Sequence, residues 1–198
     1  MKKKRHRRKR IHSFPTVEQL EAELERVTLR RQSWKMLYMF GSAVITAAAV
    51  AVLVTAFWMP AFRIYGSSME PALREGEFVL SARNTDYGQG DIIAFFHNGR
   101  IFVKRVIAAG DDWVDMDDDG NVYVNGKELA EPYLNEKAFG ETDIVLPYQV
   151  PTGELFVLGD HRSASLDSRN AVVGCVSEEQ IIGKVLLRIW PLNRFGKI

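Results

Sequence analysis

Two adjacent serines, Ser67 and Ser68, lie between Gly66 and the turn-forming sequence Met69-Glu70-Pro71. A serine hydroxyl is a weak nucleophile on its own and attacks a carbonyl only when a neighbouring base accepts its proton. Nucleophilic catalysis here therefore requires a base elsewhere in the chain, and a fold that brings that base to one of the two hydroxyls.

One candidate base is Lys104, which precedes Arg105 within the apolar stretch Ile101–Ile107. Side chains of a strand alternate between its two faces, so the two cations would point in opposite directions, each among apolar neighbours. A guanidinium stays charged, whereas the pKa of an ammonium group falls when it is desolvated. Lys104 is therefore the one that could become a neutral amine. Judged on this strand alone, the alternative that both cations extend into solvent is favoured.

A second polar stretch is the loop Gly159–Asn170, which follows an apolar strand. Asp167 and Arg169 could pair and stiffen this loop. His161 offers a Ser-His arrangement, because histidine is the commonest general base. A solvated loop rich in turn-forming residues would have the same composition.

Metal and cofactor chemistry finds little support in the sequence. Asp115, Asp117 and Asp119 match the first half of an EF-hand calcium loop, but Gly126 stands where the bidentate glutamate is required, so an acidic hairpin is favoured. The sequence has no Cys and His cluster with zinc spacing and no phosphate-binding glycine loop. The one cysteine, Cys175, lies in an apolar context and is interpreted as a small buried side chain. We expect no cofactor and no metal.

A long apolar stretch precedes the two serines. Residues 36–62 carry no charge, and Met36–Trp58 is longer than the ~20 residues that cross a hydrocarbon core. A cleaved secretory signal is the main alternative, with Val54-Thr55-Ala56 as its cleavage site. The long segment before the apolar stretch, and the length of the stretch itself, favour an uncleaved transmembrane helix over residues 36–60.

Charge is distributed unevenly about this span. Residues 1–35 contain twelve Lys and Arg against four Glu, whereas residues 36–198 contain fourteen Lys and Arg against twenty-one Asp and Glu. Basic residues flank membrane spans on the cytoplasmic side, so the arm over residues 2–10 predicts a cytoplasmic N-terminus and places everything after residue 60 outside. Nucleic-acid binding and a solvated tail are the alternatives for this arm. A short surface helix starting near Thr16 is predicted before the span.

From residue 61 the sequence pattern changes to short strands and turns. It predicts a mainly antiparallel β domain over residues 61–198, with a hairpin-rich insertion at residues 112–153. The expected strands are 78–80, 91–96, 101–107, 122–124, 155–158 and 181–190. The expected hairpin-type turns are Asn98-Gly99, Asp119-Gly120 and Asn125-Gly126.

Four stretches, taken in this order, resemble the bacterial type I signal peptidases, which are Ser-Lys leader peptidases. They are Gly66–Leu73, Gly90–Phe95, Lys104–Asp111 and Gly159–Arg169. Each is a weak signal alone, but four in order after a membrane anchor are specific. The resemblance covers roughly residues 62–192. It implies a single-pass membrane protease, with an antiparallel β-sheet catalytic domain on the extracytoplasmic side.

The resemblance also implies roles for individual residues. Ser68, rather than Ser67, would be the nucleophile, and Lys104 the general base of a Ser-Lys dyad. Ser165 would orient the Lys104 amine by a hydrogen bond, while Asp167 and Arg169 would hold the loop in place. The Ser68 backbone N–H would form part of an oxyanion hole.

Substrate positions are implied as well. Phe62, Ile64 and Val103 lie where this family lines its groove for preproteins with small residues at the first and third positions before the cut. Gram-negative members of the family often carry a second oxyanion donor at the position of Gly66. Many Gram-positive members have glycine there, as this sequence does. His161 stands where the family usually has Asn. The implied partners are preprotein signal peptides and the lipid bilayer. We expect a monomer that binds neither nucleic acid nor metal.

Three other functions remain open from the sequence. One is a specialised peptidase for pilin-like precursors. Another is a self-cleaving Ser-Lys protease of the repressor type, against which the transmembrane helix counts. The third is a membrane-anchored binding protein with an inactive peptidase fold, against which the intact Ser68 and Lys104 count.

Overall fold

The computed structural model describes residues 16–83 and 86–198, with the side chains of residues 54–58 excepted. The basic arm at residues 2–10 lies outside the described residues. The chain divides into two compact units, one ending at Val52 and the other running from Leu53 to Ile198. Each unit is described by itself.

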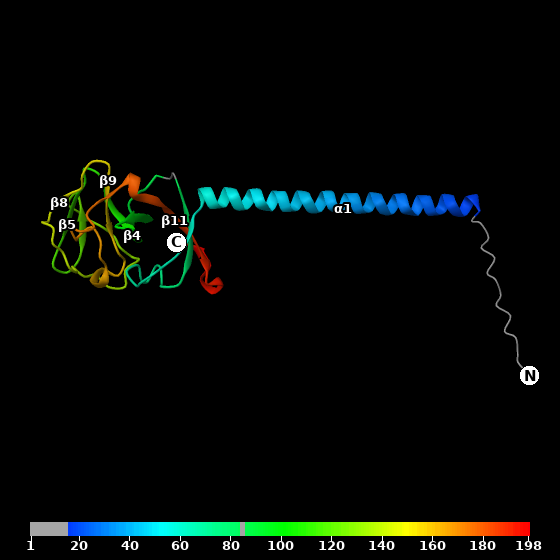
Figure 1. The fold of residues 1–198 in the computed structure, drawn as a ribbon. Coiled ribbons are helices and arrows are strands. Elements are labelled where there is room, and N and C mark those ends of the chain that lie inside the picture. Colours follow the sequence, from blue (N-terminus) through cyan, green and yellow to red (C-terminus); the bar gives the residue numbers. More distant parts are fainter. Residues whose placement is uncertain (1–15, 84–85) are drawn as a thin grey trace, which may run out of the picture. The chain divides into compact units, whose positions relative to one another are not determined.

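Helix α1 (Val17–Trp58) runs without interruption for 42 residues (Figure 1). At its start the Thr16 backbone N–H donates to Gln19 Oε1 at 3.2 Å, which is one half of a capping box. The most apolar 18-residue window within Val17–Leu53 has a mean hydropathy of 2.1, and none of that window is buried. An apolar helix with no protein face to cover it is typical of a membrane span. By length and composition, α1 is a candidate transmembrane helix that also includes the predicted surface helix.

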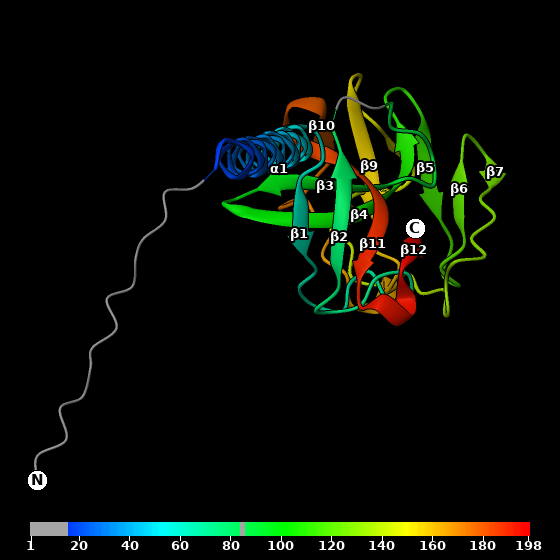
Figure 2. The ribbon, with the colours of Figure 1, turned by 90° about the vertical axis from the view of Figure 1, so that its right-hand side faces the viewer.

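The second unit contains two antiparallel sheets (Figure 2). The larger one has the strand order β1-β2-β11-β3-β4-β9-β10, with β12 paired to β11. Its strands are β1 (Ala61–Arg63), β2 (Phe78–Ala82), β3 (Ile92–His97), β4 (Arg100–Ala109), β9 (Glu154–Leu158), β10 (Val176–Ser177), β11 (Ile181–Trp190) and β12 (Gly196–Lys197). Because β4 lies between β3 and β9, the middle of β4 is shielded from solvent on both edges.

The smaller sheet has the order β7-β6-β5-β8 and falls within the insertion. Its strands are β5 (Trp113–Met116), β6 (Val122–Val124), β7 (Lys127–Glu128) and β8 (Tyr148–Gln149). The turns Asn98-Gly99 and Asn125-Gly126 have positive φ at both residues, the conformation for which Asn-Gly is preferred in two-residue hairpins. Short 3-10 helices are η1 (Arg162–Ala164), η2 (Glu178–Gln180) and η3 (Leu192–Arg194).

Three apolar clusters form the core of the β unit. One joins the two sheets through Ile107, Val114, Phe156 and their neighbours. A second packs Met69, which follows Ser68 directly, and Leu73 against the large sheet. A third fills the opposite part of that sheet around its central strands. The second cluster matters for function, because it fixes the backbone immediately after the two serines.

This arrangement confirms the predicted fold class, which combines an N-terminal apolar helix with a mainly antiparallel β unit. All six expected strands are present within a few residues of their expected bounds. The sequence missed six further strands: β1, β5, β7, β8, β10 and β12. Most of them have two or three residues, too few for alternation to emerge. In β5, Asp115 faces outward between the buried Val114 and Met116, so the acidic character of that stretch concealed a strand.

Candidate active site

Ser68 is placed by its neighbours rather than by a regular element. Gly66 has a φ of +77°, a conformation that glycine adopts without strain, and it turns the chain at the end of β1. Met69 is 2% exposed and Leu73 is fully buried, and the Leu73 N–H donates to the Met69 carbonyl at 2.8 Å. These anchors leave Ser68 partly buried and Ser67 exposed. The two serines are therefore distinct in the fold, although they look equivalent in the sequence.

The Lys104 amine reaches Ser68. Lys104 is 2% exposed, and its Nζ donates a hydrogen bond to Ser68 Oγ at 2.7 Å. Burial lowers the pKa of Lys104 from 10.5 to about 8; Asp167 and Asp160 act in the opposite direction, and Arg169 lowers the pKa further. An amine of this pKa is partly neutral near neutral pH, and only the neutral form can accept the Ser68 proton. The sequence left the desolvation of Lys104 open, and the structure places this side chain in a buried position.

Arg105 lies on the opposite face of β4 and is neutralised by pairing. Its Nε and Nη2 donate to the two Asp160 oxygens at 2.8 and 2.6 Å, and its Nη1 donates to the Gly90 carbonyl at 2.8 Å. The guanidinium carbon also lies 3.9 Å from the Tyr133 ring centroid. Burial raises the pKa of Asp160, while the Arg105 hydrogen bonds pull it down. Neither Lys104 nor Arg105 extends freely into solvent, which was the alternative favoured from the strand alone.

The polar stretch Gly159–Asn170, here termed the catalytic loop, is a buried network rather than a solvated loop. Arg169 Nε and Nη2 donate to Asp167 at 2.8 and 2.9 Å, and Asp167 also accepts from the Gly159 N–H at 3.0 Å. Both Asp167 and Arg169 are 1% exposed. Further bonds from Arg169 reach the Phe139 carbonyl at 2.6 Å and the Arg162 carbonyl at 2.9 Å. The loop is therefore rigidly held beside Lys104.

This loop contacts the Ser68 backbone directly. The His161 N–H donates to the Ser68 carbonyl at 3.1 Å. A Cβ at Gly159 would lie 2.5 Å from the same carbonyl and would collide with the Ser165 side chain, so glycine is required at this position. The Ser165 hydroxyl is buried and has no hydrogen-bond partner among the described residues. The expected hydrogen bond from Ser165 to Lys104 is thus not formed here, although Ser165 packs at the site.

The His161 ring does not replace Lys104. Its Nδ1 is buried without a hydrogen-bond partner in the described part of the chain, and no side-chain bond joins it to Ser68 there. His97, the other histidine of this unit, contacts Asn98 and the Phe102 ring at the β3–β4 turn. The geometry favours a Ser-Lys pair over a Ser-His pair.

A groove of about 700 Å³ opens beside the Ser68–Lys104 pair. All three residues that the sequence assigned to substrate binding, Phe62, Ile64 and Val103, line it. Its other lining residues are Arg63, Tyr65, Gly66, Ser67, Ser68, Met69, Arg100, Ile101, Phe102, Lys104, Ala164 and Leu166. Residues from β1 and β4 thus form its walls, together with the two serines. A concavity of this size beside a buried amine and a serine hydroxyl is a candidate binding site.

The acidic stretch of the insertion serves a turn. Asp117 accepts hydrogen bonds from the Asn121 backbone at 2.8 Å, the Asn121 side chain at 2.7 Å and the Tyr123 hydroxyl at 3.2 Å. These bonds, led by the Asn121 side chain, lower the pKa of Asp117. Among the described residues no group of three or more His, Cys, Asp or Glu side chains could hold a metal ion. Asp117 is accordingly a hairpin residue, as the sequence favoured.

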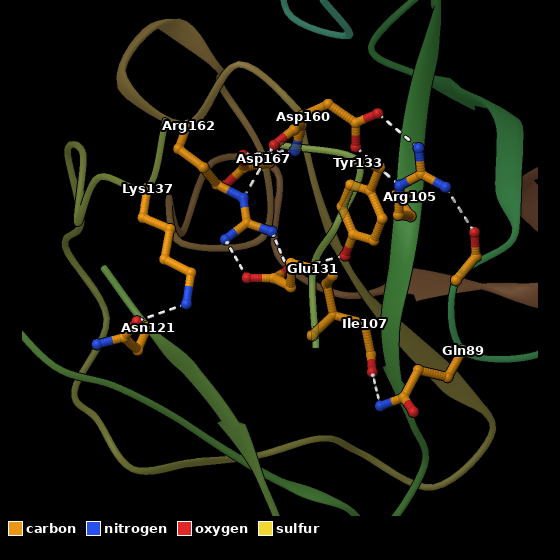
Figure 3. A network of polar contacts seen from close by, with 12 residues as sticks. Gln89, Arg105, Ile107, Asn121, Glu131, Tyr133, Lys137, Asp160, Arg162 and Asp167 are labelled. Carbon is orange, nitrogen blue, oxygen red and sulfur yellow. Dashed lines mark hydrogen bonds and ion pairs between the residues drawn. The ribbon is translucent and has the colours of Figure 1, made fainter. Parts of the chain in front are cut away.

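Sequence reasoning missed several charged residues behind the site. Figure 3 shows Glu131 and Tyr133 of the insertion directed at Arg162 and Arg105. Arg162 and Glu131 form an ion pair whose side chains are 1% and 0% exposed. The signal available in the sequence was the number of arginines in the catalytic loop, since buried arginines need carboxylate partners. Which carboxylates they would find could not be read from the sequence.

Comparison with known proteins identifies relatives of this chain. The family model "Signal peptidase, peptidase S26" matches residues 37–190. The chain is 36% identical over 169 residues to signal peptidase I T of Bacillus subtilis (strain 168), covering 78% of this chain and 86% of that protein. It is 34% identical over 173 residues to signal peptidase IB of Staphylococcus aureus (strain N315), covering 77% and 89%.

A solved structure of a signal peptidase I from Enterococcus faecalis V583 is also similar, with 31% identity and a TM-score of 0.44, over 50% of this chain and 97% of that chain. The family model extends over more than half of the chain, and the relatives exceed 30% identity over more than two thirds of it. The chain belongs to the signal peptidase family, peptidase S26.

Proposed function

We propose that this protein removes signal peptides from preproteins, with Ser68 as the nucleophile and Lys104 as the general base. The observation that carries the proposal is the 2.7 Å hydrogen bond between Lys104 Nζ and Ser68 Oγ, made by an amine that is almost fully buried. A buried lysine whose pKa lies near 8 can activate a serine without a histidine.

The reaction follows from this pair. The Ser68 Oγ attacks the scissile carbonyl carbon while the neutral Lys104 amine takes the hydroxyl proton. Collapse of the tetrahedral intermediate breaks the C–N bond, and the Lys104 ammonium donates its proton to the leaving amine. Lys104 then deprotonates a water molecule that hydrolyses the acyl-enzyme. The Ser68 backbone N–H contributes to an oxyanion hole, in which donors stabilise the charge developing on the carbonyl oxygen.

The catalytic loop keeps the base in its place. Asp167 and Arg169 fix the loop through buried hydrogen bonds, and Ser165 lies beside Gly159 with a hydroxyl that has no hydrogen-bond partner among the described residues. We propose that Ser165 turns toward the Lys104 amine once the Ser68 proton has been transferred, because Ser68 then no longer accepts the Lys104 hydrogen bond. Phe62, Ile64 and Val103 hold the small side chains that precede the cut.

The membrane anchor restricts the substrates to proteins that cross the bilayer. α1 anchors the protein in the bilayer as a single span, with the N-terminus in the cytoplasm and the β unit on the extracytoplasmic side, because basic residues gather before the helix. Preproteins that emerge across the bilayer are then presented on the side that carries the groove. The protein acts as a monomer without a metal or other cofactor.

Cleavage of a preprotein by the full chain in detergent tests this proposal. Ser68→Ala and Lys104→Ala are each expected to reduce kcat/KM by about 10⁴-fold or more, since each removes one member of a unit. Ser67→Ala is the matched control and retains most of the activity. Wild-type kcat/KM should rise with pH through an apparent pKa of about 8, as Lys104 becomes neutral.

Three results would contradict the mechanism. Equal cleavage by wild type, Ser68→Ala and Lys104→Ala would exclude the pair altogether. Loss of cleavage in Ser67→Ala, with retention in Ser68→Ala, would reassign the nucleophile. Loss in His161→Ala, with retention in Lys104→Ala, would replace the base by histidine. A pilin-like precursor assayed alongside the preprotein separates a specialised peptidase from a general one.

A further inference from the structure

The insertion does more than extend the fold, because one of its irregular segments wraps the catalytic loop. Between β7 and β8, the Phe139 carbonyl accepts from Arg169 Nη1 at 2.6 Å, and the Thr142 hydroxyl donates to the Arg169 carbonyl at 3.1 Å. A Cβ at Gly140 would collide with the Arg169 guanidinium and lie 2.7 Å from the Arg162 carbonyl. The backbone of this segment therefore packs directly against the catalytic loop.

Glu131 makes the most deeply buried of these contacts. Its carboxylate accepts hydrogen bonds from both terminal nitrogens of Arg162, one of them at 3.1 Å, and from the Tyr133 hydroxyl at 2.8 Å. Arg162 Nε in turn donates to the Gly159 carbonyl at 3.1 Å. Gly159 is the residue whose Cα faces the Ser68 carbonyl. A short series of contacts thus leads from Glu131 through Arg162 and Gly159 to the backbone of Ser68.

Tyr133 provides a second connection, to the strand that carries the base. Its ring stacks on the Arg105 guanidinium, which is also held by Asp160. Arg105 directly follows Lys104 on β4, so any movement of Arg105 along the strand moves Lys104 as well. Figure 3 shows Tyr133 between Arg105 and Glu131. Glu131 and Tyr133 are thus linked, through Arg162 and Arg105, to the segments that carry Ser68 and Lys104.

We propose that Glu131 and Tyr133 are positioning residues, which hold the catalytic loop and β4 in the relation that brings the Lys104 amine to Ser68. This inference rests on the proposed function, because it gives the insertion a part in the same reaction. Neither residue touches the substrate groove. Their effect is transmitted through Arg162 and Arg105.

The charges of this region allow the role to be measured. Three arginines and three carboxylates surround the site in buried pairs: Arg105 with Asp160, Arg162 with Glu131, and Arg169 with Asp167. Asp167, Arg169 and Asp160 are the charged groups that act most strongly on Lys104. Neutralising Glu131 leaves one buried positive charge without its partner. Added positive charge disfavours the Lys104 ammonium, so the loss of activity should come with a change in its titration.

The test uses the full chain in detergent and two readouts. Glu131→Gln keeps the shape of the side chain but removes its charge, and Glu131→Asp keeps the charge but shortens the side chain. Glu136→Gln, an exposed residue of the same segment, is the control. Preprotein cleavage is followed against pH, and the Lys104 pKa is measured independently from the pH dependence of acetylation by acetic anhydride, read by peptide mass spectrometry.

Glu131→Gln is expected to reduce kcat/KM by about 100-fold, because small displacements of catalytic groups have effects of this size. It should also lower the Lys104 pKa in both readouts. Glu131→Asp should lose activity but keep the wild-type pKa, and Tyr133→Phe, which retains the ring, should show a smaller loss than Tyr133→Leu. Glu136→Gln should match wild type.

A Glu131→Gln protein with the activity and titration of Glu136→Gln would overturn the inference, as would a loss of activity fully accounted for by its unfolded fraction. The acetylation readout does not depend on turnover. A wild-type protein that cleaves no preprotein would contradict the proposed function, while a lowered Lys104 pKa in Glu131→Gln would still support the positioning role. Unchanged acetylation would refute that role independently.

Discussion

The two faces of β4 treat a buried cation in opposite ways. On one face Arg105 meets a carboxylate, a carbonyl and an aromatic ring, so its charge is balanced. On the other, Lys104 has a serine hydroxyl as its hydrogen-bond partner and no ion pair among the described residues. One face stabilises a permanent charge, and the other makes a charge costly. Of these two adjacent residues, Arg105 is held in a buried ion pair, whereas Lys104 is a desolvated amine beside Ser68.

The choice of residue type fits each face. Arg105 cannot lose its proton, and its planar guanidinium suits the two oxygens of Asp160. An ammonium can respond to desolvation by releasing a proton. Exchanging the two side chains would place an inert cation beside Ser68 and a titratable one in the ion pair. The contrast is therefore testable by removing the partner from one face or the charge from the other.

Removing the partner of Arg105 is expected to have the largest effect. Asp160→Asn leaves a buried guanidinium without its carboxylate, and breaking a buried pair costs about 3–5 kcal/mol. The free energy of unfolding of the β unit should fall by that amount in urea, followed by near-ultraviolet circular dichroism. Asp118→Asn, on an exposed residue of the insertion, is the control and should be neutral. A stable Asp160→Asn protein would mean that the pair contributes little.

Removing the charge of Lys104 should act in the reverse direction. Lowering a lysine pKa from 10.5 to about 8 corresponds to roughly 3 kcal/mol of disfavoured ammonium. Lys104→Met should therefore abolish cleavage yet raise the stability of the β unit by about 2–3 kcal/mol at pH 7. Such trade-offs between stability and activity are common at catalytic sites.

The sign of the pH dependence provides a second check on Lys104. Its pKa is lower in the folded than in the unfolded chain, so between pH 8 and 10.5 the unfolded state binds more protons at this group, and the contribution of Lys104 to wild-type stability becomes more favourable as the pH rises. The advantage of Lys104→Met should shrink across that window. Lys127→Met, an exposed lysine on β7, should show no such trend. A constant advantage at all pH values would refute the titration.

More could be predicted from the sequence about the Lys104 face of β4 than about the Arg105 face. Ser68 and Lys104 were assigned through motifs that resemble a known family, whereas the strand around Lys104 alone favoured solvent exposure of both cations. The partner of Arg105 lies 55 residues away along the chain, and Glu131 lies 31 residues from Arg162. No local pattern specifies such pairings, since several carboxylates could have served each arginine. The Ser165 hydrogen bond implied by the resemblance depends on a side-chain rotamer, and the Ser165 hydroxyl has no hydrogen-bond partner among the described residues.

The smallest effect is expected at a cation that lies on neither face of β4. Lys137 pairs with Glu128 at 3.4 Å on the insertion, with the two side chains 39% and 57% exposed. Solvated pairs contribute about 0–1 kcal/mol, because water and salt screen the attraction. Glu128→Gln should therefore change the free energy of unfolding by less than about 0.5 kcal/mol at physiological salt. A loss as large as that of Asp160→Asn would show that burial is not what distinguishes these cations.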